Sequence, residues 1–191
     1  MTGILGGTFD PPHNGHVALA RAALEQLPID RLIVLVAADP GHRQVVAGAG
    51  ERLALARAAF ADLPAEVVLD DNAFTVDAVR GGRFGEALFV VGADEGAAFP
   101  GWKDPDELLR WVRLAVGTRS GYPPPDLEPY RDRIVSFELD SPAISSSAVR
   151  ERAARGEPLD GLVPPAVEAA IRGAGLYRGY TRREPEDSKS H

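Results

Sequence analysis

Short apolar runs rich in valine, isoleucine and leucine constrain the fold of this chain more than any other feature. They lie at residues 31–37, 65–70, 86–92, 112–118 and 133–139. Each has the length and the β-branched composition of a buried strand. A shorter apolar stretch at residues 3–5 predicts a further strand at the start of the chain.

Segments with helical periodicity lie between several of these runs. In residues 16–27 and 51–63, apolar side chains recur every three to four positions, which is the spacing of one helix face. Strands that alternate with helices predict parallel crossover connections and a sheet covered on both sides. We therefore expect an α/β fold, namely a doubly wound, Rossmann-like parallel sheet with helices on both faces.

The length of 191 residues and the hydrophobic share of 45% suit one domain of ordinary size. We expect a single domain over residues 1–177. Residues 120–130, which contain three consecutive prolines, predict a rigid surface loop. The polar residues 178–191 predict a loose C-terminal tail.

Charge and composition exclude several classes of function. The net charge of −7 disfavours broad attraction to nucleic acids or to anionic membranes. The chain has no cysteine, so a disulfide framework, a thiolate metal site and a catalytic thiol are excluded. We see neither a secretory signal nor an apolar run near the ~18 residues that span a bilayer. We expect a cytoplasmic protein with neither a nucleic acid nor a membrane as partner.

The stretch GGTFDPPHNGH at residues 6–16 follows the first expected strand directly. Gly6 and Gly7 permit backbone angles and close approaches that a side chain would block. His13 and His16 are spaced i and i+3 at an expected helix start, where amide groups and the helix dipole favour an anion. These features predict a phosphate site. The alternative is an ordinary turn, because Asn-Gly is a common turn pair and loop histidines often only make hydrogen bonds.

A second candidate motif lies at residues 141–156, SPAISSSAVRERAARG. Ser145, Ser146 and Ser147 stand at an expected helix start, with Arg150 one turn further on. Hydroxyls and a guanidinium suit a triphosphate, because arginine gives directed, charge-assisted hydrogen bonds. The structural alternative is that one of the serines caps the helix.

The two motifs together resemble those of the nucleotidyltransferase superfamily. In that superfamily a glycine-rich turn is followed by His-x-Gly-His, and an Ile-Ser-Ser-Thr-x-x-Arg motif comes later; here Ser147 replaces the usual threonine. The superfamily includes mononucleotide adenylyltransferases, phosphopantetheine adenylyltransferase and some cytidylyltransferases. The resemblance implies a nucleotidyltransferase type of Rossmann-like fold.

Further resemblance, over roughly residues 3–177, is to the bacterial nicotinate-nucleotide adenylyltransferases. The segments FVVGADEGAAFPGWKDPDELL (89–109), GLVPPAVEAAIRGAGLY (161–177) and DNAFTVDAV (71–79) are similar to segments of that family. The resemblance implies that Trp102 lies against the pyridine ring, that Thr75 contacts the nicotinate side, and that Asp94 lies on the adenosine side. Without it, Trp102 reads as a core or rim aromatic and Asp94 as a helix cap.

The resemblance also implies a reaction and a set of site residues. The acceptor's phosphate attacks the α-phosphorus of ATP and yields a dinucleotide and pyrophosphate. His16 acts near the α-phosphate, His13 near the neighbouring phosphates, and Ser146, Ser147 and Arg150 at the β- and γ-phosphates. The remaining ATP-side residues are Gly7, Thr8, Phe9 and Ser145. Mg²⁺ bridges the phosphates and needs no dedicated protein cage.

Two departures from the family pattern lie on the acceptor side. Arg43 replaces a lysine in DPGHRQ (39–44) and is a candidate partner of the acceptor's phosphate, and Phe74 stands where tyrosine is usual. The acceptor alternatives are therefore nicotinamide mononucleotide, phosphopantetheine or another phosphorylated metabolite. A non-catalytic nucleotide sensor is the alternative from another class, and the sequence leaves open whether the chain forms a homo-oligomer.

Overall fold

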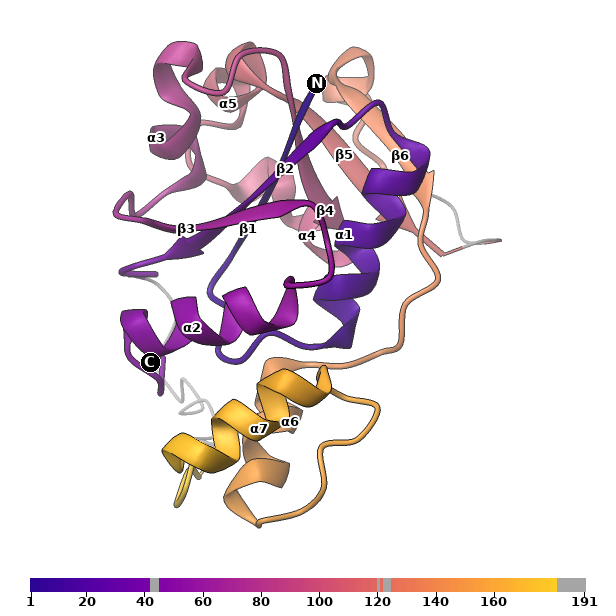
Figure 1. The fold of residues 1–191 in the computed structure, drawn as a ribbon. Helices are drawn as coiled ribbons and strands as arrows, with labels where there is room; N and C mark the ends of the chain where they lie inside the picture. The colour runs from indigo at the N-terminus through magenta and orange to yellow at the C-terminus, as the bar shows by residue number, and fades with distance from the viewer. Residues whose placement is uncertain (42–44, 120, 122–124, 182–191) are drawn as a thin grey trace, which may run out of the picture.

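Six strands form one sheet in the computed structural model, which describes residues 1–41, 45–119, 121 and 125–181 (Figure 1). The strands are β1 (Thr2–Gly7), β2 (Arg31–Ala37), β3 (Ala65–Asp70), β4 (Ala87–Gly92), β5 (Arg113–Thr118) and β6 (Ile134–Glu138). Their order across the sheet is β3-β2-β1-β4-β5-β6, and every neighbouring pair is parallel. All the strands predicted from the sequence are present, so the expected doubly wound parallel sheet is confirmed.

Helices connect these strands and extend beyond the last one. The α-helices are α1 (Asn14–Gln26), α2 (Ala49–Ala59), α3 (Thr75–Val79), α4 (Ala93–Ala98), α5 (Pro105–Trp111), α6 (Ser146–Ala154) and α7 (Pro165–Ala174). Three short 3-10 helices are η1 (Arg80–Gly82), η2 (Phe99–Gly101) and η3 (Glu128–Arg133). The helices expected over 16–27 and 51–63 correspond to α1 and α2. The expected loop 120–130 leads into η3, although residues 120 and 122–124 lie outside the described part of the chain.

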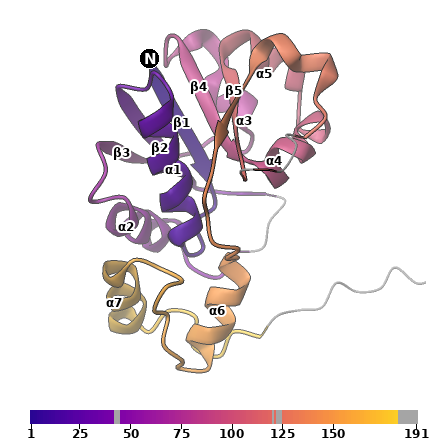
Figure 2. The same ribbon diagram turned by 90° about the vertical axis from the view of Figure 1, so that its right-hand side faces the viewer.

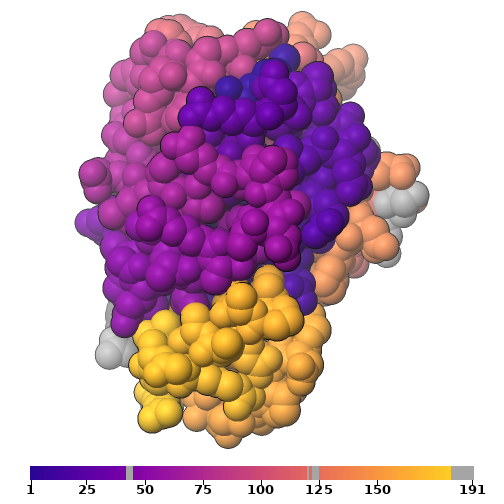
Figure 3. All heavy atoms as spheres, viewed as in Figure 1, coloured from indigo at the N-terminus to yellow at the C-terminus, as the bar shows by residue number. Residues whose placement is uncertain are grey.

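The sheet is buried on both faces, which explains why its strands are continuous apolar runs. Along β2, Val34 and Val36 point into one core, whereas Ile33 and Leu35 point into the other. Helices α1 and α2 cover the first face, and α3, α4 and α5 cover the second (Figure 2). Helix α7 packs against α2 beyond the sheet (Figure 3).

The strand order reverses between β1 and β4. From β1 the chain runs outward to β2 and β3, and it then returns to the other side of β1 to form β4. In doubly wound sheets the ligand crevice lies at the carboxyl ends of the strands beside such a reversal. The stretch GGTFDPPHNGH, which begins inside β1, is thus placed at that position.

No helix within the described residues has both the length and the apolar character needed to cross a membrane.

The carboxylate of Asp10 connects three distant parts of the chain. It is 3% exposed, and its Oδ2 accepts a hydrogen bond from the Val46 amide at 2.7 Å. Its Oδ1 accepts hydrogen bonds from the Ala47 amide at 3.1 Å and from the Tyr177 hydroxyl at 2.9 Å. Asp10 therefore holds the turn after β1, the segment before α2 and the end of the C-terminal helical region together.

Arg52 of α2 joins the turn after β1, the end of β2 and the segment before α2 through backbone carbonyls. Its side chain is 1% exposed. The guanidinium donates to the carbonyls of Thr8 at 2.9 Å, Ala37 at 2.6 Å, Ala38 at 2.9 Å and Ala47 at 3.1 Å. Each of these carbonyls lies where a strand has just ended or a helix is about to begin, so Arg52 shapes the rim of the crevice.

The Tyr177→Phe variant tests the contribution of the Asp10 cluster to stability. Losing the hydroxyl removes one hydrogen bond from a buried carboxylate, so we expect the free energy of unfolding in urea to fall by about 2 kcal/mol. Tyr130→Phe is the matched control, because within the described residues the Tyr130 hydroxyl has no hydrogen-bond partner. Equal effects of the two substitutions would contradict the assignment.

Candidate active site

The turn between β1 and α1 is shaped by a glycine and an aromatic ring. Phe9 adopts a positive φ of 52° and is 2% exposed. Its ring packs edge-on against His16, with the ring centroids 5.1 Å apart. A Cβ on Gly7 would lie 2.8 Å from the Phe9 ring, so the fold requires glycine there. Gly7 and Phe9 thus place the two histidines at the end of β1.

The rings of His13 and His16 lie against each other, with centroids 3.7 Å apart. The backbone amide of His13 donates to Nδ1 of His16 at 3.1 Å. Because Nδ1 is an acceptor in this bond, a neutral His16 ring carries its proton on Nε2. His16 can therefore present an N–H donor to the adjacent cleft.

His13 occupies the N-cap position of α1 and is 9% exposed. Burial lowers the pKa of His13 to about 4, because the charged imidazolium would lose its hydration. The His13 ring is therefore neutral near pH 7. Within the described part of the chain, its buried Nδ1 has no hydrogen-bond partner.

The amide groups at the start of α1 are less available than the sequence suggested. The Asn14 amide donates to the Leu162 carbonyl at 2.8 Å, and the His16 amide donates to the His13 carbonyl at 2.9 Å. The expectation that this helix end offers its amides to an anion is therefore met only in part.

The three serines at the start of α6 have different partners. Ser145 is the N-cap, and its Oγ accepts a hydrogen bond from the Ala148 amide at 3.2 Å. The Ser146 hydroxyl donates to the Pro11 carbonyl at 2.9 Å. The Ser147 hydroxyl accepts from Arg150 at 3.1 Å. The structural alternative applies to Ser145, while Ser146 joins α6 to the turn before α1.

Arg150 is buried beside the same turn. Its guanidinium donates to the Asp10 carbonyl at 2.5 Å and to the Tyr180 hydroxyl at 3.2 Å. It also lies 4.8 Å from the centroid of the Tyr180 ring. Its buried Nε has no partner among the described residues. Tyr180 belongs to the segment 178–191 that was predicted to be a loose tail, and residues 182–191 lie outside the described part.

A cleft of about 560 Å³ lies at the carboxyl ends of the strands. Of the residues predicted from the sequence, the following line it: Gly7, Thr8, Phe9, His16, Thr75, Trp102 and Ser146. The predicted residues His13, Ser145, Ser147 and Arg150 are not among its lining residues. Asp94 is exposed in the first turn of α4, and its neighbour Glu95 lines the cleft instead. Arg43 lies outside the described residues.

The far end of the cleft is aromatic. Trp102 is half-buried, and its ring centroid lies 5.9 Å from that of Phe89 and 5.5 Å from that of Phe99. Thr75 opens α3, and the preceding Phe74 is 43% exposed. Trp102 thus packs on the core with one side and also contributes to the cleft wall, so the two interpretations of this residue are compatible.

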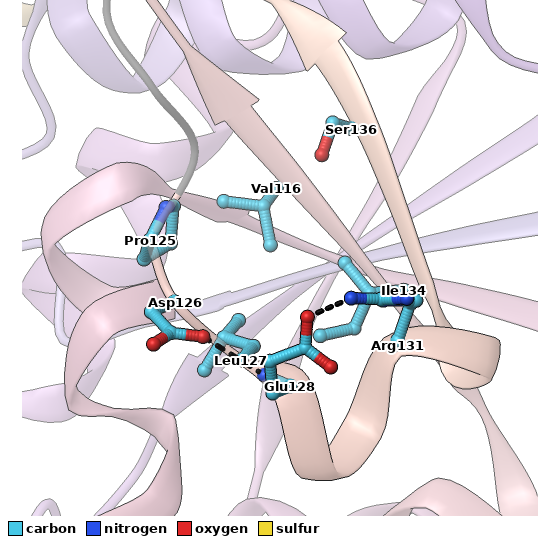
Figure 4. Close-up of a pocket in the computed structure, with 8 residues that line it drawn as sticks. All are labelled: Val116, Pro125, Asp126, Leu127, Glu128, Arg131, Ile134 and Ser136. Atoms are coloured by element: carbon cyan, nitrogen blue, oxygen red, sulfur yellow. Dashed lines mark hydrogen bonds and ion pairs between the residues drawn. The ribbon is translucent and has the colours of Figure 1, made fainter.

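A second cavity, of about 400 Å³, lies between β5, β6 and the segment around η3 (Figure 4). Val116 and Ser136 line it from the strands, and Glu128 and Arg131 form an ion pair across its edge. Among the described residues that line this cavity, none was predicted from the sequence as a site residue and none is a histidine. The cleft beside β1 is therefore the candidate active site.

Several residues that shape the cleft were not predicted. Asp10 and Tyr177 lie in stretches that the sequence analysis singled out, residues 6–16 and 161–177, but neither residue was itself proposed. Arg52 and Lys103 gave no sequence signal, because a single cationic residue on a helix or loop is usually a surface group.

Within the described chain, no three His, Cys, Asp or Glu side chains are arranged to hold a metal ion.

Comparison with known proteins agrees with this geometry. The cytidylyltransferase-like family model matches residues 4–152. A protein of Gemmatimonas aurantiaca named "Probable nicotinate-nucleotide adenylyltransferase" is 36% identical over 98% of this chain and 97% of its own length. One of the same name from Chromobacterium violaceum is 35% identical over 92% and 98%.

Solved structures show the same fold. Nicotinic acid mononucleotide adenylyltransferase of Plasmodium falciparum, complexed with NaAD, superposes with a TM-score of 0.73 at 14% identity, over 92% of this chain and 96% of that one. Its complex with APC gives a TM-score of 0.72 at 15% identity over the same shares. With the matches over nearly the whole chain, these findings show that the protein belongs to the nicotinate-nucleotide adenylyltransferase family, within the cytidylyltransferase-like nucleotidyltransferases.

Proposed function

We propose that the protein transfers the adenylyl group of ATP to the phosphate of nicotinate mononucleotide and so forms nicotinate adenine dinucleotide and pyrophosphate. One observation carries the proposal. A single cleft at the β1/β4 reversal is lined by His16 and Ser146 at one end and by Trp102 and Thr75 at the other. The two ends lie on opposite faces of the sheet, so one ligand can cross the strand ends between them.

The chemistry requires no general base from the protein. The acceptor's phosphate is largely ionised near neutral pH, and one of its oxygens forms a bond to the α-phosphorus of ATP. The bond between that phosphorus and the bridging oxygen to the β-phosphate breaks, and pyrophosphate leaves with the electron pair. The protein contributes alignment and stabilisation of charge on the transferring group.

In this proposal His16 stabilises the transferring group. Its hydrogen bond from the His13 amide fixes the ring orientation and leaves Nε2–H as the donor. His13 supports the neighbouring phosphates as a neutral group, since burial keeps it uncharged. The backbone of Gly7, Thr8 and Phe9 forms the floor beneath the nucleotide.

Arg150 and Ser147 are assigned to the β- and γ-phosphates. Neither residue lines the cleft in this structure, where Arg150 bonds to Ser147 and to Tyr180. The proposal therefore includes an exchange of partners, in which phosphate oxygens replace the Tyr180 hydroxyl on the guanidinium. Mg²⁺ would bind to the ATP phosphates, where it neutralises part of their charge. Arg43 remains the predicted partner of the acceptor's phosphate.

The experiment that tests the function is magnesium-dependent pyrophosphate release from ATP. Nicotinate mononucleotide, nicotinamide mononucleotide and phosphopantetheine are supplied in parallel. Release that is strongest with nicotinate mononucleotide supports the proposal. Pyrophosphate release with only one of the other acceptors would identify that compound as the substrate instead. ATP binding without pyrophosphate release in the presence of any of the three acceptors would favour a nucleotide sensor.

The His16→Ala variant should retain the fold and lose most turnover, by about a hundredfold to a thousandfold in kcat, because it removes a donor aimed at the transferring phosphate. Gln26→Ala, at the other end of α1, is the control, since Gln26 bonds only to the backbone of Glu138. Wild-type turnover in a folded His16→Ala variant would refute the assignment.

The low pKa of His13 predicts a dependence of stability on pH. The ordinary pKa of 6.5 applies to the unfolded chain and a pKa of about 4 to the folded protein, so the unfolded state binds more protons between these values. Stability should therefore fall as the pH drops from 6.5 to 4, by about 3 kcal/mol once both values are passed.

His13→Asn should make the pH profile of urea unfolding shallower over this window, since asparagine does not titrate and is an acceptable N-cap. Parallel profiles for the wild type and the variant would contradict the assignment of this pH dependence to His13.

A further inference from the structure

We propose that Lys103 determines which acceptor the cleft prefers, by pairing its ammonium group with the carboxylate on the pyridine ring. The inference rests on the proposed function and adds a residue to it. An acceptor that carries the acid would bind and react better than one that carries the neutral amide.

The charge of the cleft wall is the first argument. Among the described residues that line the cleft, Lys103 is the one lysine or arginine. The acidic side chains on the same wall are Asp70 and Glu95. An anionic ring substituent therefore has a single fixed positive charge to meet on the described wall.

The position of Lys103 is the second argument. It follows Trp102 directly in the chain, and its Nζ lies 4.4 Å from the centroid of the Phe74 ring. Phe74 is the N-cap of α3, which begins at Thr75. The ammonium group thus lies between the Trp102 segment and the start of α3. Because His16 belongs to the helix on the other face of the sheet, Lys103 meets the ring end of the acceptor and not its reacting phosphate.

The neighbours of Lys103 hold its side chain in place without using all of its hydrogen-bond donors. Its Nζ donates to Asp77 at 3.0 Å, and Asp77 also accepts from Arg80 at 2.6 Å. The hydrogen bond from Lys103 is the main cause of the lowered pKa of Asp77, so this carboxylate is ionised near neutral pH. An ammonium group has three donors. Asp77 takes one of them and the Phe74 face covers another side, which leaves donor capacity for a ligand.

The wider ion-pair network is electrically balanced. Arg80 also bonds to both oxygens of Glu107, at 2.8 and 2.9 Å. Asp77 and Glu107 therefore carry two negative charges against the two positive charges of Arg80 and Lys103. The Lys103 side chain is 41% exposed, so the contact is open to solvent and its effect on affinity is moderate.

The experiment compares kcat/KM for nicotinate mononucleotide and for nicotinamide mononucleotide in the wild type and in Lys103→Met. Methionine keeps most of the length of the side chain and removes the charge. We expect the preference for the acid to fall about tenfold, through a higher KM for the nicotinate substrate with little change for the amide. Lys103→Arg should retain most of the preference, since it retains the charge.

Arg80→Met is the matched control. It breaks the ion pairs with Asp77 and Glu107 but does not alter the cleft wall, so the preference between the two acceptors should remain unchanged. A purely structural role of Lys103 in joining α3 to α5 would lower activity with both acceptors alike, and that result would overturn the inference.

Calorimetric titration of the two mononucleotides into the wild type and Lys103→Met separates this inference from the proposed function. Tighter binding of the acid that is lost in the variant supports Lys103 even if no pyrophosphate is released. Equal binding of acid and amide by the wild type, or binding of neither, overturns the role of Lys103. Pyrophosphate release from the wild type tests the function independently.

Discussion

The architecture of the site depends on one buried carboxylate. Burying a charge is costly unless it is paired and hydrogen-bonded, and Asp10 meets this condition only when three segments converge on it. The amides of Val46 and Ala47 come from the segment before α2, and the hydroxyl of Tyr177 comes from beyond α7. The hydrogen bond from Tyr177 therefore joins the turn after β1 to the end of the C-terminal helical region, and Ser146 of α6 lines the cleft, so this region contributes to the site although it lies outside the sheet.

The sheet could be predicted from the sequence because its strands are buried on both faces. A strand such as β2 (Arg31–Ala37) has no solvent-facing side, so its sequence is an almost uninterrupted run of apolar residues. Helices α1 and α2 are long enough for their periodicity to show. Helices α3 and α4 have only five and six residues, and one or two turns are too short for a 3.6-residue period to be recognised. Their positions on the second face became evident only with the structure.

Candidate site residues could be predicted where they lie in a sequence motif. Residues whose position depends on contacts between distant parts of the chain were missed. Residues such as His16 and Ser146 lie within recognisable stretches, and the structure brings them to one cleft. Arg52 lies in the helical pattern ERLALARAAF and resembles a surface arginine. Its structural role depends on hydrogen bonds to backbone carbonyls as far away in the sequence as Thr8. The sequence could not tell which partners the consecutive hydroxyls of Ser145 and Ser147 take, because the helix geometry assigns them: the Ala148 amide to Ser145 and Arg150 to Ser147.

The charges around the turn bear on how a site in an acidic protein would attract the phosphates that the proposed function requires. Arg52 and Arg150 lie close to the single carboxylate of Asp10, with Arg150 3.9 Å from it, while His13 remains uncharged because it is buried. Among these four side chains the charges sum to one excess positive charge, and a buried charge acts more strongly than one on the surface. If the Arg52 side chain moved, four backbone carbonyls would lose their hydrogen bonds to its guanidinium. Arg150 is held in part by the hydroxyl of Tyr180, a weaker partner than a phosphate, so under the proposed function it is the cation that would exchange partners for a triphosphate.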